Sequence, residues 1–72
     1  MTNKDRGYEQ AVAARDHAAR ALYRAELAVH DAHQTHIDEW ISAANDRLHV
    51  AVAAYEAADA LVSRLRDHAL AA

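Results

Sequence analysis

The sequence predicts an all-α protein, and three observations support that fold class. Alanine, the residue with the highest helix propensity, makes up 20 of the 72 residues. The strongest helix breakers are almost missing, since there is no proline and only one glycine. Apolar residues recur every three or four positions, which is the spacing that marks one side of a helix. A chain of this length forms a single domain, residues 1–72.

A first helix is predicted over about residues 5–33. Its alanines are spaced strictly three and four apart, so they form a thin seam that lets a partner helix approach closely. Leu22 and Val29 flank this seam and widen the contact side. The seam consists of Ala11, Ala14, Ala18, Ala21, Ala25, Ala28 and Ala32.

A second helix is predicted over about residues 36–70. Its apolar stripe has the same three-and-four spacing but alternates large with small side chains. The large ones are suited to fill the space opposite the alanines of the first helix. The stripe consists of Ile37, Ile41, Ala44, Leu48, Ala51, Tyr55, Ala58, Val62, Leu65 and Ala69.

The two stripes are out of phase by two residues, so one straight helix cannot present both on one side. A bend at about residues 33–36 is therefore predicted, which gives an antiparallel two-helix hairpin. Thr35 followed by Asp38 matches a helix-start signature. One alternative is a continuous helix of about 100 Å in a coiled coil. Another is a further break at Asn45–Asp46.

A hairpin this small has few sizeable apolar side chains for its interior, so self-association is expected. Apolar residues also extend beyond the second stripe, at Trp40, Ala43, Val50, Ala57 and Leu61 among others. We expect a homo-oligomer, most simply a four-helix bundle of two hairpins. The alternative is a face that binds a different protein. The predicted interface residues are Ala11, Ala18, Leu22, Ala25, Val29, Trp40, Ile41, Leu48, Val50, Tyr55, Leu61, Val62 and Leu65.

The charge distribution favours one orientation of the two hairpins. Residues 25–46 carry five acidic side chains and no lysine or arginine, whereas residues 1–24 have a net charge of +2. The bend is therefore acidic and the open end is more basic. Antiparallel hairpins place each basic region over the other's acidic bend, so we expect that arrangement.

His30, His33 and His36 are the one cluster of side chains with metal-binding chemistry. Their spacing matches no known metal signature, so we predict no metal and treat the three as weak candidates. A milder hypothesis is a pH-responsive module, in which protonation of this cluster, with His49, offsets the acidic bend at about pH 6.

No catalytic motif or cofactor site is recognisable, because there is no cysteine and no glycine-rich phosphate loop. Arg15, Arg20 and Arg24 offer a basic face for nucleic acid. The layout resembles that of the Rop family of plasmid RNA-binding hairpin dimers, although no motif residues carry over. The net charge of −3 disfavours binding driven by phosphate.

The sequence thus predicts a small non-enzymatic protein that acts through protein contacts, in a structural or regulatory role. Its expected partner is a second copy of itself. The runner-up function is that of a nucleic-acid-binding accessory protein. A cytoplasmic location is expected, because no apolar run reaches the roughly 20 residues of a membrane helix and the first residues do not resemble a signal peptide.

Overall fold

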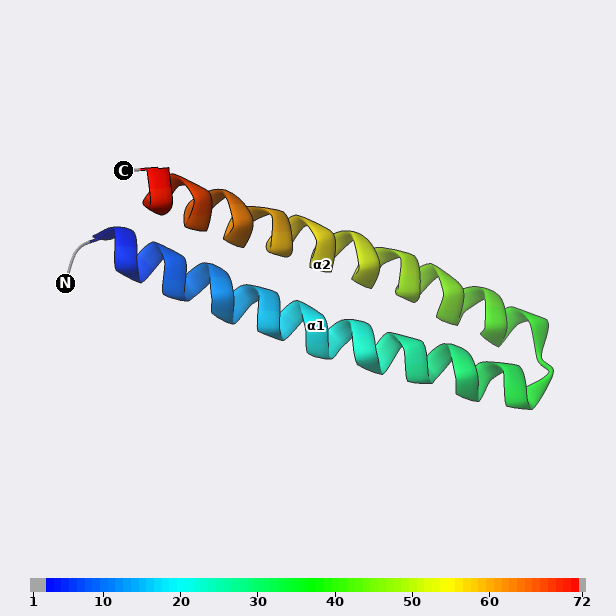
Figure 1. Ribbon diagram of the computed structural model, residues 1–72. Helices are drawn as coiled ribbons and strands as arrows, with labels where there is room; N and C mark the ends of the chain where they lie inside the picture. The colour runs from blue at the N-terminus through cyan, green and yellow to red at the C-terminus, as the bar shows by residue number, and fades with distance from the viewer. Residues whose placement is uncertain (1–2, 72) are drawn as a thin grey trace.

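The protein is a hairpin of two long antiparallel helices. The computed structural model describes the backbone of residues 3–71 and the side chains of residues 6–70. Helix α1 spans Asn3–Thr35, helix α2 spans Asp38–Ala71, and no strand occurs within residues 3–71. The helices lie side by side (Figure 1). The predicted all-α hairpin is confirmed, whereas the alternatives of one continuous helix and of a break at Asn45–Asp46 are wrong.

The chain reverses at His36 and Ile37, slightly later than the sequence pattern indicates. His36 has a φ of 59°, in the left-handed region, which is a common way to end a helix. Its N–H donates a hydrogen bond of 3.3 Å to the carbonyl oxygen of His33. The last turn of α1 is therefore closed by a residue that is not glycine.

Thr35 does not begin the second helix as predicted, because it is the last residue of α1. Its hydroxyl donates to the carbonyl oxygen of Ala32 at 2.6 Å and accepts from the N–H of Ile37 at 3.1 Å. The carbonyl of Ile37 accepts from the N–H of Ile41 at 3.0 Å and so opens the hydrogen-bond ladder of α2. The threonine hydroxyl bonds locally to its own helix, a known competing pattern for this residue type.

The interior of the hairpin is narrow and consists mostly of alanine. Val62 is the largest fully buried side chain, at 1% exposure. Most other members of the two apolar stripes are half-buried, whereas Ala14, Ile37 and Ala69 are exposed. Among the side chains of residues 6–70, no polar or charged residue is buried. The buried residues are Ala11, Ala18, Ala32, Ala44 and Val62.

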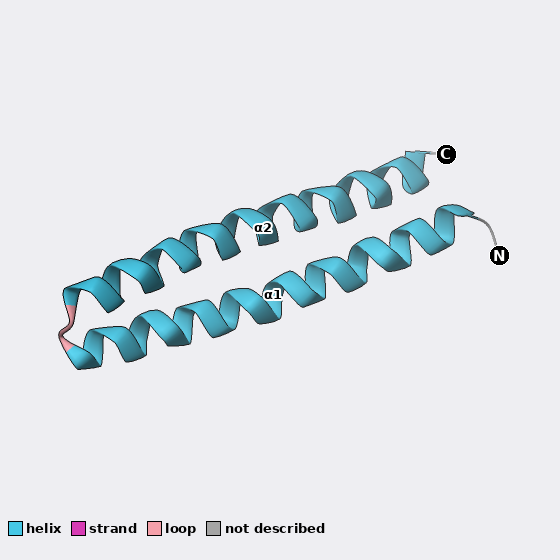
Figure 2. Cartoon of the chain, turned by 180° about the vertical axis from the view of Figure 1, so that it is seen from behind, coloured by secondary structure: helices cyan, strands magenta, loops and turns pink. Residues whose placement is uncertain are grey.

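The molecule is a rod rather than a globule. It measures 53 × 18 × 12 Å, with a radius of gyration of 16.2 Å. A globular domain of this length has a radius of gyration of about 11 Å. The first residues of α1 and the last residues of α2 lie at the same end, opposite the bend (Figure 2). The two broad sides of the rod are therefore the surfaces available for contact.

Candidate interaction surface

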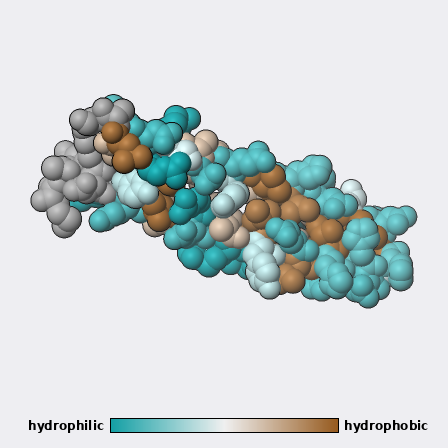
Figure 3. Space-filling model, viewed as in Figure 1, coloured by the Kyte–Doolittle hydropathy of each residue, from teal (hydrophilic) through white to brown (hydrophobic). Residues whose placement is uncertain are grey.

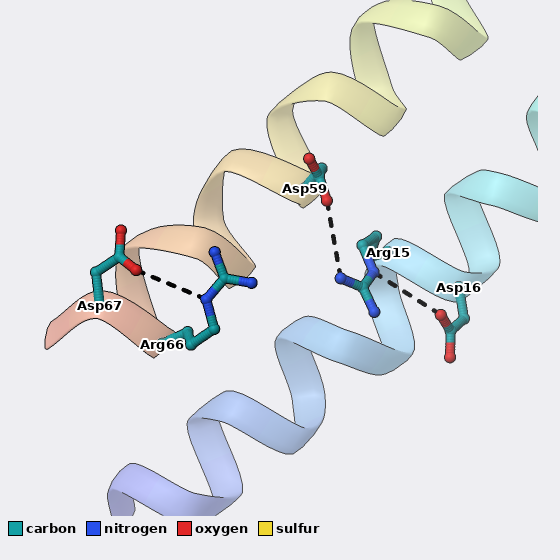
Figure 4. Close-up of polar contacts among 5 residues, drawn as sticks. All are labelled: Arg15, Asp16, Asp59, Arg66 and Asp67. Atoms are coloured by element: carbon teal, nitrogen blue, oxygen red, sulfur yellow. Dashed lines mark ion pairs between the residues drawn. The ribbon is translucent and has the colours of Figure 1, made fainter. Parts of the chain in front are cut away.

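One broad side of the hairpin carries an ion pair between the helices. Arg15 on α1 has its Nη1 atom 3.7 Å from Oδ1 of Asp59 on α2, and its Nε atom 3.9 Å from Oδ1 of the adjacent Asp16 (Figure 4). Both Arg15 and Asp59 are partly exposed, so the pair contributes about 0–1 kcal/mol. It links the helices nearer the open end of the hairpin than the bend, without driving their association.

A hollow of about 450 Å³ lies between the helices next to the bend, and we call it the bend hollow. Four alanines contribute to its lining, and the indole of Trp40 forms part of its wall. Asp31 and Arg47 bring opposite charges to it. It is lined by Ala28, Asp31, Ala32 and Thr35 of α1 and by Trp40, Ala43, Ala44 and Arg47 of α2.

The residues around the bend hollow continue along the rod at seven-residue intervals. From Trp40 and Arg47 the interval leads to Ala54 and Leu61 on α2. From Ala28 it leads back to Ala21 and Ala14 on α1. Residues seven apart lie on nearly the same side of a helix. We call this surface the Trp40 face; it consists of Ala14, Ala21, Ala28, Thr35, Trp40, Arg47, Ala54 and Leu61.

Large apolar side chains on or beside the Trp40 face are exposed. Trp40 is 57% exposed and Leu61 is 39% exposed, and the neighbouring Val50 is 71% exposed. The small residues Ala43 and Ala57, predicted to widen the apolar arc of the second helix, are exposed as well, and so is Ala54. The single hairpin thus leaves this arc without a packing partner.

Hydrophobic side chains also reach the surface in the half of the rod nearer the bend, where they form a patch across both helices (Figure 3).

The 13 predicted interface residues divide by exposure. Ala11, Ala18 and Val62 are buried within the hairpin, and Trp40, Val50 and Leu61 are exposed. The half-buried ones are Leu22, Ala25, Val29, Ile41, Leu48, Tyr55 and Leu65. Ten of the 13 are thus buried or half-buried in the single hairpin.

Sequence reasoning missed several residues that the structure makes important. Val52 is half-buried, and Arg47 lines the bend hollow. Asp59 pairs with Arg15 across the helices. Asn45, Val52 and Asp59 share a seven-residue spacing, which is the signal that could have found them beside the main stripe.

The histidine cluster does not assemble into a binding site. His30, His33, His36 and His49 are all exposed. Within the part of the chain that the structure describes, no three His, Cys, Asp or Glu side chains are grouped so as to hold a metal ion. His30 and His33 lie on α1, His36 lies in the bend and His49 lies on α2.

The three arginines of the predicted basic face do not share one surface. Arg15 is directed toward α2, where it meets Asp59. Arg20 and Arg24 are exposed and lie about 140° and 180° around α1 from Arg15, at 100° per residue. The arrangement therefore splits the cationic patch on which nucleic-acid binding would depend.

Among the described residues, neither helix combines the length and the apolar character that crossing a membrane requires. The described side chains contain no buried polar atom without a hydrogen-bond partner. The Trp40 face and its bend hollow are the candidate interaction surface. No protein-family model, no curated protein and no solved structure matches the chain.

Proposed function

We propose that two copies of the hairpin pack antiparallel through their Trp40 faces and form a four-helix bundle. The bundle acts through protein contacts, in a structural or regulatory role, without chemistry of its own. The observation that carries this proposal is the exposure of Trp40 and Leu61 beside a hollow lined with alanine.

The area of exposed surface supports a partner for the hairpin. The chain exposes 5550 Å². A globular monomer of 7.9 kDa exposes about 4400 Å², so the hairpin has an excess of about 1150 Å². A stable interface buries about 800 Å² on each partner. The excess is therefore large enough to supply one such interface.

The composition of the interior supports the same conclusion. Four of the five buried apolar residues are alanines, and burying a methyl group contributes far less than burying a leucine. A small domain with so thin a core commonly gains stability by oligomerisation. Covering Trp40, Val50 and Leu61 with a second hairpin adds the large apolar contacts that the single chain lacks.

Light scattering at micromolar concentration tests the proposal. The expected mass is twice that of the chain. Ala54→Glu places a charge in the middle of the Trp40 face while keeping a good helix former, so this variant should shift toward the monomer.

Ala53→Glu is the matched control, because Ala53 is exposed, adjacent in sequence and directed about 100° away around α2. This variant should keep the mass of the unmodified protein. A natural chain that is monomeric and melts cooperatively under the same conditions would overturn the proposal.

A further inference from the structure

The α2 side of the bend hollow has the spacing of a packing hole. Trp40, Ala43, Ala44 and Arg47 stand at positions i, i+3, i+4 and i+7, the four positions that surround an inserted side chain in a coiled coil. The two residues in the middle are alanines, so the floor is low. No side chain of the described residues fills this hole. The side chain that inserts into such a hole is called a knob, and within the single hairpin the hole has none.

We infer that Leu61 of a second copy fills the bend hollow and that, by symmetry, Leu61 of the first copy fills the hollow of the second. This inference rests on the proposed antiparallel dimer and specifies its register. In a twofold interface each contact occurs twice, so one pairing fixes the whole alignment. Leu61 is suitable because it is apolar, is 39% exposed, and lies three seven-residue intervals from Trp40 on the same face.

The register that follows has a symmetry axis near Val52. Paired residues are equally far from the axis, and Leu61 of the second copy stands over the middle of the interval between Trp40 and Arg47. Ala51 and Ala54 then lie where the two α2 helices come closest. Small side chains at that point permit close helix packing.

Val50 is the other exposed apolar side chain beside this face, and it fits the hollow less well. Placing Val50 of the second copy there moves the axis to about residue 47, so about half of the 34 residues of α2 lose their partner. That register also leaves Leu61 uncovered. The Leu61 register keeps most of α2 paired.

The charges at the ends of the interface agree with the Leu61 register. Glu39 of one copy lies opposite Arg64 of the other, and Trp40 lies opposite Leu65. Glu39 and Arg64 are both exposed in the hairpin. Glu39 at the acidic bend of each copy thus meets a basic side chain near the open end of the other, which suits a second copy of this chain as the occupant.

Crosslinking between two single-cysteine variants tests the register, because the natural chain contains no cysteine. Glu39→Cys and Arg64→Cys leave both the hollow and Leu61 intact. An equimolar mixture treated with a short bismaleimide should give a linked dimer containing one copy of each variant. Each variant alone should remain unlinked, because identical positions stand roughly 35–40 Å apart at 1.5 Å per residue.

The outcomes separate this inference from the proposed function. A dimeric mass without linkage in the mixture overturns the Leu61 register and leaves self-association standing. Linkage of Glu39→Cys to itself shows bends side by side and overturns the antiparallel arrangement. A monomeric mass overturns the proposed function itself. Arg20→Cys, on the far side of α1, should not link to Glu39→Cys and serves as the control for random collision.

A size exchange tests the knob and the hole directly. Leu61→Ala removes the knob and Ala43→Leu fills the floor, so each should raise the dissociation constant of the dimer by about tenfold or more. The double variant puts the large side chain on the opposite partner and should recover much of the affinity. Additive losses in the double variant would contradict the contact between these two positions.

Discussion

At the scale of single residues, His36 ends α1 in a backbone conformation that is sterically unfavourable for any residue with a side chain. Its φ of 59° lies in the left-handed region, where glycine carries no steric penalty. His36→Gly should therefore raise the free energy of unfolding by about 0.5–1 kcal/mol, measured by urea denaturation. Gln34→Gly, inside the last turn of α1, is the control and should lower it by a similar amount. Destabilisation by His36→Gly would contradict this account of the bend.

The position of the reversal was predictable from sequence to within two or three residues, but its geometry was not. The phase slip between the two apolar stripes shows that the chain must turn. Neither glycine nor asparagine occurs in residues 33–37 to mark the left-handed position. Thr35 was read as the start of a helix because its hydroxyl can cap an N-terminus, whereas the structure directs it back to Ala32.

At the scale of the helices, the close contact of α1 and α2 depends on the absence of side-chain volume. Ala18 is 9% exposed, and a larger side chain there would separate the helices. Ala18→Leu should lower the free energy of unfolding by about 1–3 kcal/mol in chemical denaturation.

Ala13→Leu is the matched control, since Ala13 is exposed on the same helix and leucine has a helix propensity similar to that of alanine. It should change stability by less than about 0.5 kcal/mol. Equal losses from both variants would show that the position of the alanine on α1 is unimportant.

The three-and-four spacing predicts which side of each helix faces the other, and burial of Ala11, Ala18 and Val62 agrees with it. It does not reveal how far contact extends around each helix. Val52 lies outside the stripe yet is half-buried. The bend hollow could not be predicted from the sequence either. Its walls come from both helices, and the spacing of residues within one helix does not specify how the two helices are rotated relative to each other.

At the scale of the whole molecule, stability should depend on protein concentration. Mass action favours a folded dimer over unfolded chains as concentration rises. A tenfold increase in concentration should raise Tm by about 5 °C or more, measured by circular dichroism. A Tm that is constant over this range would indicate a hairpin that folds alone.

The single tryptophan provides an independent reading of the same equilibrium. Trp40 is 57% exposed in the hairpin, and packing of the Trp40 face would cover it. Its fluorescence should shift to the red on dilution, at the concentrations where light scattering shows dissociation. Ala54→Glu should show the red-shifted spectrum at all concentrations.

Both helix ends at the open tip of the rod point in one direction, away from the bend (Figure 1). A domain or fluorophore fused to either end would therefore emerge from the same pole of each hairpin. In the antiparallel bundle, the two fused groups would occupy opposite poles of an assembly at least as long as the 53 Å rod. The pair would work as a stiff spacer, and energy transfer between the attached dyes would report its length.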